Sequence, residues 1–184
     1  MGKIFKLVMF SLMLIAAFAI SGCGGDKFAG DWVTTQKNMA FKFGGDYYKQ
    51  LKIEKNGDSY IIKEIISSYD LKKTKNGGKG FNVTYDGNFV WEKDKERQIA
   101  AKPQGDNQLV VNGAFGAIAI TYVEKEGTLL IGKEVYTKEK SDSMNEFKKA
   151  EQARLQKMYD DNDMGFYTQK TLTSLKFSDG DNKK

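Results

Sequence analysis

The chain has no histidine, one cysteine and one proline among its 184 residues. Without histidine, Ser-His-Asp and Cys-His catalysis are excluded, together with zinc, iron and copper sites that use imidazole ligands. A lone cysteine cannot form a disulfide within the chain, so the fold has to be stable through its core alone. These absences leave only carboxylate, lysine, tyrosine and hydroxyl chemistry open.

No catalytic group stands out among the residue types that remain. Glu64 and Glu92 could supply a carboxylate pair, but the strand pattern does not bring them together. We therefore predict that the chain is not an enzyme, and we expect neither a cofactor nor a metal ion.

The longest apolar run lies at the N-terminus, where Lys3 and Lys6 precede the segment 7–20. Its 14 residues are fewer than the ~20 that a membrane-spanning helix needs. A basic start, a short apolar stretch and small residues after it are typical of a secretory signal peptide. The small residues stand directly before the single cysteine, Cys23.

Ile20-Ser21-Gly22-Cys23 resembles the lipobox of bacterial lipoproteins, with Ile20 in the place of the usual leucine. In that family the signal peptide, here 1–22, is cut before the cysteine, whose thiol receives a diacylglycerol and whose new amino group is usually acylated. The resemblance implies that Cys23 is lipidated and anchors the chain to a membrane, because two or three acyl chains hold a protein firmly. An ordinary secretory signal with an unrelated cysteine is the alternative.

The residue after the cysteine bears on which membrane holds the protein. In Gram-negative members of the lipoprotein family, an aspartate there favours retention in the inner membrane, and this chain has Gly24. The resemblance therefore implies the outer membrane in a Gram-negative cell envelope, and otherwise the outer face of the cytoplasmic membrane. Residues 23–27 form the expected lipidated tether, ~14 Å long when extended.

The charge of the chain is mildly positive. Loss of Lys3 and Lys6 with the signal peptide lowers the formal net charge from +5 to +3, and the excess is spread along the chain. Proteins that bind nucleic acids usually cluster their basic residues on one face or arm. We therefore expect a solvated surface and no nucleic-acid partner.

The pattern from Phe28 onward is that of short β-strands with turn signals every ~8 to 12 residues. Asn56-Gly57 is the strongest hairpin signal, because both central residues of such a turn need positive φ. Asp86-Gly87-Asn88 is predicted to be a second turn. The strands are expected at 28–33, 47–55, 59–66, 81–86, 89–93, 96–102, 108–112, 117–125 and 128–139.

Sequential hairpins of this kind favour a mainly β fold in which an antiparallel meander closes into a barrel, with a sandwich as the alternative. A single domain is expected over 28–177. The glycine-rich segment 76–80 lacks the Gly-Lys-Ser/Thr ending of a phosphate loop and is interpreted as a hairpin loop.

One helix is predicted from about 143 to 161. Ser143 and Glu146 have the S-x-x-E spacing of a capping box. One apolar face, interrupted by charged residues, is formed at helical spacing by Met144, Phe147, Leu155 and Met158. We expect this face to pack on the outside of the barrel; a partner-binding helix is the alternative.

The acidic run 160–163 is followed by Gly165 and partly matches a calcium-binding loop. The match fails because Met164 and Thr171 stand where that loop needs oxygen ligands. We interpret the run as the end of the helix, with Gly165 as its stop. A final strand is expected within 166–177, followed by a flexible tail over 178–184.

Gly30-Asp31-Trp32 on the first expected strand is a G-x-W element and resembles the lipocalin and lipocalin-like families. In those families the tryptophan closes one end of the barrel, and a central cavity holds a small apolar ligand. The resemblance implies that Gly30 and Trp32 form a barrel-closing structural motif. The family's arginine that packs on the tryptophan has no counterpart, since Arg97 and Arg154 lie away from the end of a late strand.

Two functions follow from these features. The first is a membrane-anchored, non-catalytic binding module for a small apolar or amphipathic ligand. The second is an envelope interaction or structural lipoprotein whose filled core docks a protein partner. The aromatic residues that would line a cavity or fill the core are Phe81, Tyr85, Phe89, Trp91, Phe115 and Tyr122.

Overall fold

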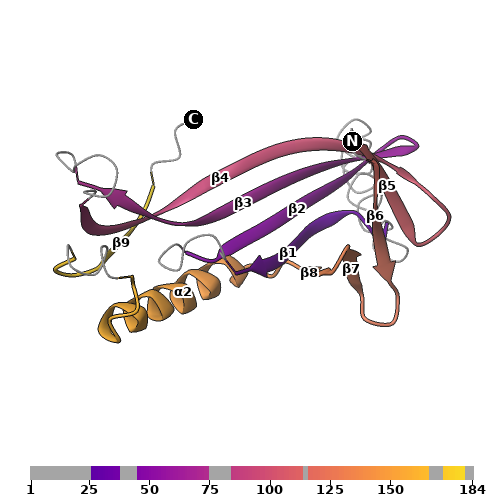
Figure 1. Cartoon of the computed structure of the whole chain (residues 1–184). Helices are drawn as coiled ribbons and strands as arrows, with labels where there is room; N and C mark the ends of the chain where they lie inside the picture. The colour runs from indigo at the N-terminus through magenta and orange to yellow at the C-terminus, as the bar shows by residue number, and fades with distance from the viewer. Residues whose placement is uncertain (1–25, 38–44, 75–83, 114–115, 166–171, 181–184) are drawn as a thin grey trace, which may run out of the picture.

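The structure is a computed structural model that describes residues 26–37, 45–74, 84–113, 116–165 and 172–180. Eight antiparallel strands form a closed β-barrel, and a ninth strand and a helix lie outside it (Figure 1). The barrel strands are β1 (Gly30–Gln36), β2 (Tyr47–Asn56), β3 (Ser59–Lys73), β4 (Tyr85–Pro103), β5 (Gln108–Gly113), β6 (Gly116–Val123), β7 (Thr128–Ile131) and β8 (Glu134–Lys138). The predicted mainly β fold is thereby confirmed.

The topology is an up-and-down meander. Each strand pairs with the next along the chain, and β8 returns to β1 through Trp32↔Lys138 and Val33↔Thr137. Every connection is a hairpin, as the alternating patterns and turn signals predicted. Cys23 and the predicted signal peptide, residues 1–22, lie outside the described residues.

Strand β4 is much longer than its neighbour β5. It pairs with β3 along most of its length, but with β5 only at Lys102 and Pro103. Between its contacts with β9 and β5, residues 92–101 have no strand partner on that second edge within the described part of the chain. Figure 1 shows β3 and β4 extending well past the shorter strands.

The turn predicted at residues 86–88 is wrong, because β4 runs through it without a break. The chain reverses earlier, where Lys73 pairs with Tyr85. Gly87 has φ +75 and allows the backbone of Ser174 to come close to β4. A Cβ at position 87 would lie 1.9 Å from the carbonyl oxygen of Ser174. The strand predicted from 81 lies partly outside the described residues.

Other strand boundaries also differ from the prediction. The runs 89–93 and 96–102, predicted as separate strands, form one continuous strand within β4. The run 128–139 is split into β7 and β8 by a turn at Gly132, whose φ is +60. The first strand begins at Gly30 instead of Phe28, because the Asp26 carboxylate accepts hydrogen bonds from the backbone nitrogens of Phe28 and Ala29. These bonds hold the preceding residues in a bend.

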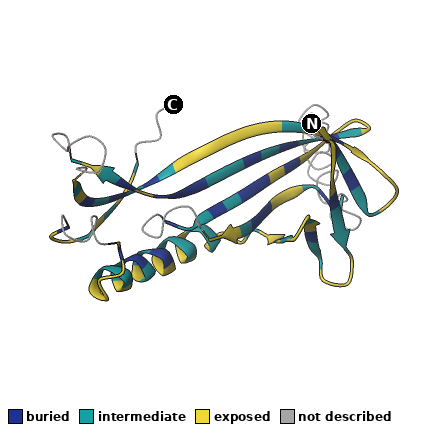
Figure 2. Cartoon of the chain, viewed as in Figure 1, coloured by how far each residue is buried: buried dark blue, intermediate teal, exposed yellow. Residues whose placement is uncertain are grey.

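The interior of the barrel is filled by side chains, which we call the barrel core. Trp32, Leu109 and Leu129 are fully buried there. The other buried members are Phe28, Leu51, Ile53, Tyr60, Ile62, Ala101, Val111, Ile120 and Tyr136. Figure 2 shows the alternation of buried and exposed residues along the strands that produces this core.

A second cluster, the outer core, lies on the opposite face of the same sheet. It is covered by the helix α2 (Ser143–Asp160) and by β9 (Lys176–Asp179). Its buried residues are Val33, Tyr48, Tyr69, Leu71, Phe89, Trp91, Leu155, Met164 and Leu172. The predicted apolar face of the helix is confirmed, because Met144, Phe147 and Met158 pack here beside Leu155.

The polar residue within that helical face has a structural partner. Glu151 is buried, and its carboxylate accepts a hydrogen bond of 2.6 Å from the backbone nitrogen of Asp46. Arg154 donates to both carboxylate oxygens of Glu151, at 2.6 and 2.8 Å. The charge that interrupts the apolar face is therefore fully paired.

The predicted capping box does not form. Asp142 is the N-cap and makes no side-chain cap bond, while Ser143 Oγ accepts from the backbone nitrogen of Lys140, upstream of the helix. At the other end, the helix ends at Asp160, and Asn162, with φ +56, is the left-handed residue that stops it. Gly165 also has positive φ, +82, but lies three residues further on. Asparagine tolerates this conformation because its short side chain bonds locally.

The last strand lies later than predicted. β9 spans Lys176–Asp179 and runs parallel to β4 at Asn88–Trp91. Residues 178–180, assigned to a loose tail, are therefore part of the sheet, since the backbone nitrogen of Gly180 still bonds the carbonyl of Trp91. Among the described residues, no helix is both long and apolar enough to span a membrane.

Candidate functional site

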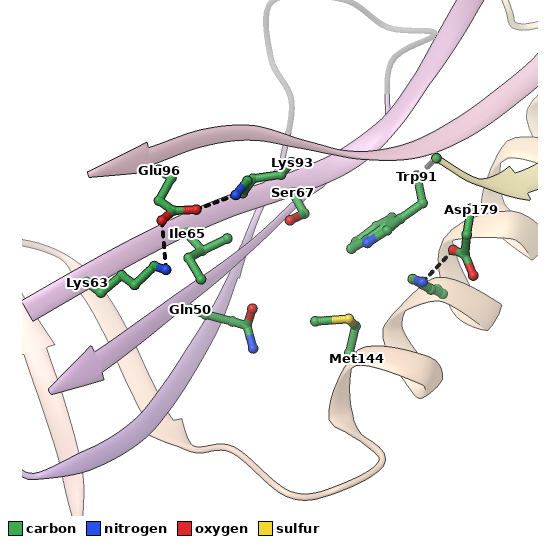
Figure 3. A pocket seen from close by; sticks show the side chains of 11 residues that line it. Gln50, Lys63, Ile65, Ser67, Trp91, Lys93, Glu96, Met144 and Asp179 are labelled. Atoms are coloured by element: carbon green, nitrogen blue, oxygen red, sulfur yellow. Dashed lines mark hydrogen bonds and ion pairs between the residues drawn. The ribbon is translucent and has the colours of Figure 1, made fainter. Parts of the chain in front are cut away.

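A hollow of about 370 Å³ lies outside the barrel, between the sheet and the start of α2 (Figure 3). We call it the groove. It is lined by Gln50, Lys63, Ile65, Ser67, Trp91, Lys93, Glu96, Met144, Lys148, Asp179 and Gly180. Its walls therefore come from β2, β3, β4, α2 and the end of β9.

Strand register places the groove residues on one face. Gln50 of β2 faces Ile65 of β3, which faces Glu96 of β4. Because successive side chains point to opposite faces, their neighbours Leu51 and Glu64 belong to the barrel interior. The groove thus lies on the outer face of the barrel wall.

A β-bulge adds Lys93 to this face. Ile66 pairs with Lys95, but Ser67 pairs with Lys93, so Asp94 is the extra residue. In a regular strand, Lys93 and Glu96 would point to opposite faces, since they are three positions apart. The extra residue reverses the alternation and brings the two side chains together.

The bulge side of the groove carries an excess of positive charge. Lys63 Nζ lies 2.7 Å from one carboxylate oxygen of Glu96, and Lys93 Nζ donates to the other. These two bonds lower the pKa of Glu96 to about 2. Among the described residues, one carboxylate is therefore shared by two ammonium groups, which leaves one positive charge uncompensated.

The opposite side of the groove is electrically balanced. Lys148 Nζ of α2 lies 2.6 Å from a carboxylate oxygen of Asp179 in β9, and 5.0 Å from the ring centroid of Trp91. Figure 3 shows this ion pair across the groove from Lys63 and Glu96. The pair ties the helix to the ninth strand.

The floor between the two charged sides is apolar and fixed. Trp91 packs edge-on against Tyr69 at 5.2 Å and against Phe147 at 6.0 Å between ring centroids. Ile65 and Met144 complete the floor. An aromatic side chain held by two others is a rigid surface for an apolar group.

The remaining wall is a polar network. Gln50 Nε2 donates to both oxygens of Glu139, at 2.8 and 2.9 Å, and Tyr48 donates its hydroxyl hydrogen to the same carboxylate. Burial, and then the negative charge of Glu139, raise the pKa of Tyr48. Tyr48 therefore stays neutral and keeps Glu139 in place.

The groove offers few groups of the kinds that act in catalysis. Ser67 supplies a hydroxyl group to the groove, and the chain has no histidine to activate that hydroxyl as a nucleophile. Glu64 and Glu92 are not brought together, since Glu64 bonds Arg97 and Glu92 bonds Lys72. No cluster of acidic residues able to hold a metal ion is found in the described part of the chain.

The predicted barrel-closing motif lies at one end of the barrel, which we call the Trp32 end. Trp32 is fully buried, and its indole nitrogen donates to the carbonyl of Phe28 at 2.7 Å. Lys138 lies 3.9 Å over the indole ring and donates to the carbonyl of Ala29. A lysine from the last barrel strand thus packs on the indole ring of Trp32.

Gly30 makes this contact sterically feasible. It has φ +120, and a Cβ there would lie 2.7 Å from Lys138 Nζ. The two motif residues and Lys138 therefore form one unit: the glycine gives room to the lysine, and the lysine covers the tryptophan.

The predicted aromatic set is divided between the two cores. Tyr122 packs against the barrel core, whereas Tyr85, Phe89 and Trp91 belong to the outer core. Phe81 and Phe115 lie outside the described residues.

The interior at the other end of the barrel is ionic. Lys49 lies 2.6 Å from Glu134, which also accepts a hydrogen bond from the Tyr136 hydroxyl at 3.0 Å. The Glu64–Arg97 pair faces the same interior. Apolar and ionic side chains together fill the described barrel, and the groove is a hollow outside it.

A comparison of the chain with protein-family models, with curated proteins and with solved structures finds no match.

Proposed function

We propose that the chain is a membrane-anchored bacterial lipoprotein, acylated at Cys23, that binds a small amphipathic anion without catalysing a reaction. The lipobox resemblance supports the anchor, and Gly24 supports the outer membrane in a Gram-negative envelope. The binding site is the groove and not the barrel interior, because side chains occupy the interior.

The observation that carries this proposal is the juxtaposition of an apolar floor and an uncompensated ammonium group. Lys63 and Lys93 share the single carboxylate of Glu96, beside Trp91 and Ile65. A volume of about 370 Å³ falls within the ~300–1,000 Å³ typical of small-molecule sites. The anionic group would lie against the lysines and the apolar part on the floor.

The test is a fluorescence titration of the acylated protein with an anionic naphthalene sulfonate dye. The double substitution Lys63→Ala/Lys93→Ala is expected to weaken binding at least tenfold. Lys95→Ala is the matched control, since Lys95 is exposed on the same strand but points to the other face. Equal affinity in both variants, or equal binding of a cationic dye of the same size, would contradict the proposal.

The anchor is tested separately by growing cells with radioactive palmitate. The wild-type chain is expected to be labelled and to fractionate with membranes. Cys23→Ser is expected to lose the label and to keep its signal peptide. An unlabelled wild-type chain would leave an ordinary secreted protein as the correct interpretation.

A second function is docking of a protein partner, supported by the unpaired edge of β4. Residues 92–101 present free backbone groups to which an extended segment could add as a strand. The test is a photo-crosslinking amino acid at Lys95 in living cells. A discrete crosslinked envelope protein that disappears when the crosslinker is moved to Ala153 on α2 would support docking; labelling at neither position would contradict it.

A further inference from the structure

We infer that the Trp32 end of the barrel faces the membrane and that the groove opens into the aqueous phase, away from the lipid surface. This inference rests on the proposed acylation of Cys23. It specifies which surface of the domain lies against the bilayer, and from which side a ligand reaches the groove.

The first described residue is fixed to the Trp32 end by several bonds. The Asp26 carboxylate accepts hydrogen bonds from the backbone nitrogens of Phe28 and Ala29, at 3.0 and 3.2 Å. It also accepts the hydroxyl hydrogen of Tyr60 and lies 3.7 Å from Lys55 Nζ. The chain therefore enters the domain beside the β2–β3 hairpin.

The next two residues hold the entry point to the other hairpins at that end. Lys27 Nζ donates to the Asn107 side chain in the β4–β5 turn and to Glu124 in the β6–β7 turn. Phe28 is buried between the rings of Tyr60 and Tyr122. The β2–β3, β4–β5 and β6–β7 turns therefore all contact residues 26–28, the segment that follows Cys23.

The length of chain before this segment limits how far the domain can stand from the anchor. Only Gly24 and Gly25 separate Cys23 from Asp26, which allows at most ~11 Å between the two Cα atoms. Because the acyl chains on Cys23 insert into the bilayer, the Trp32 end is held against the lipid headgroups. The Trp32 end is therefore the part of the domain that lies nearest the membrane surface.

The groove lies further along the strands. At ~3.3 Å per residue, Glu96 and Trp91 of β4 are ~17 and ~33 Å from Ala101 at the Trp32 end. The headgroup layer of one leaflet is only ~5–8 Å deep. Figure 1 shows α2, which covers the groove, at the opposite end of the long strands from the β4–β5 turn. A ligand therefore enters the groove from water.

The experiment places a single fluorophore at either end of the acylated full-length chain in lipid vesicles. Acylated Cys23 has no free thiol, so an introduced cysteine is the sole site of labelling. Asp58→Cys labels the exposed turn at the Trp32 end, and Ala153→Cys labels the exposed side of α2. The vesicles carry a nitroxide quencher on the lipid headgroup.

The expected result is that the fluorophore at position 58 loses most of its emission and the fluorophore at position 153 loses almost none. A long glycine-serine insertion after Gly25 is expected to relieve the quenching at 58, because the domain is then free to turn. Equal quenching at both positions, stronger quenching at 153, or no effect of the insertion would overturn the orientation.

The outcomes separate this inference from the proposed anchor. A chain that fails to float with the vesicles refutes acylation, and the orientation falls with it. A chain that floats but shows the reverse pattern of quenching refutes the orientation alone.

Discussion

The barrel core and the outer core use the two faces of the same strands, but they are assembled from different parts of the chain. The barrel core collects alternate residues of eight strands that follow one another through hairpins. The outer core joins the extended ends of β3 and β4 to α2 and to β9, which are distant in the sequence. The first core therefore depends on local register and the second on long-range docking.

The difference also separates stability from binding. The barrel core is sealed by Trp32 and Lys138 at one end and contains paired charges near the other. The outer core leaves a hollow at its margin, where α2 meets the bulged strand. A layer that covers only part of the sheet is the place where a fold can keep room for a ligand.

The largest effect is expected from Trp32→Ala in the barrel core. The indole is fully buried, and its removal should lower the free energy of unfolding by ~3–5 kcal/mol, through lost burial and the cavity left behind. Urea unfolding followed by far-ultraviolet circular dichroism measures the loss. Ala153→Ser on the exposed side of α2 is the control, and an effect as small as that of the control would refute the sealing role.

Leu155→Ala is the corresponding substitution in the outer core. Leu155 is fully buried, so the expected loss is ~2–5 kcal/mol. The loss should be confined to one region: amide hydrogen exchange should rise in α2 and β9 and stay unchanged in β5 to β7. A uniform rise over the whole chain would show that the two cores unfold as one unit.

A smaller effect is expected from Gly30→Ala at the Trp32 end. The new Cβ would meet Lys138 Nζ in a backbone conformation that favours glycine, at a cost of ~1–3 kcal/mol. Gly105→Ala is the comparison, because Gly105 also has positive φ but has open space around it. Thermal unfolding of both variants should show the greater loss at Gly30.

The smallest effect concerns the groove. Glu96→Gln removes the carboxylate that Lys63 and Lys93 share. It should raise the affinity for an anionic dye by at most ~fivefold, because exposed ion pairs contribute little and are screened by solvent. Dye titration measures the change. Weaker binding in the variant would contradict the assignment of the lysines as the anion site.

The pH dependence of the wild-type groove follows from the same carboxylate. The folded state lowers the pKa of Glu96 to about 2, so its ion pairs are present above the ordinary carboxyl pKa and are lost only as the pH falls through 2. Dye affinity should therefore stay level through the titration range of ordinary carboxylates. Asp179 also lines the groove, so Glu96→Gln is the control: a step in affinity within that range that is present in the wild-type chain and absent from the variant would show that Glu96 is not paired as described.

The hairpin at residues 57–58 shows what the sequence can predict. Asn56-Gly57 predicted a tight reversal, and β2 and β3 do meet there, with Asn56 paired to Ser59. The prediction made Asn56 and Gly57 the two central turn residues. The observed central residues are Gly57 and Asp58, one position later, and of the predicted pair only Gly57 has positive φ. Turn residues and strand alternation depend only on residues that are neighbours in the sequence. The barrel could therefore be predicted from them.

The groove could not be predicted because its parts meet only through long-range contacts. The bulge at Asp94 reverses the side-chain alternation of β4 without a glycine to mark it. Asp179 lies at the groove because β9 pairs with β4 in the parallel direction. Such a pairing is not formed through a tight turn, so no turn residues in the sequence indicate it. Lys138 could have been found: it ends the last barrel strand, and a lysine can pack on an indole ring as an arginine does.

The charged edge of β4 also affects how copies of this chain meet one another. From Glu92 to Arg97 the charges alternate in sign at every residue. Over residues 95–97, which follow the bulge at Asp94, facing residues in a two-fold antiparallel pairing differ by an even number of positions, so like charges would lie opposite each other. The edge therefore repels its own copy while leaving its backbone open to a segment of different charge pattern. Copies of this chain that meet along this edge would therefore remain separate molecules.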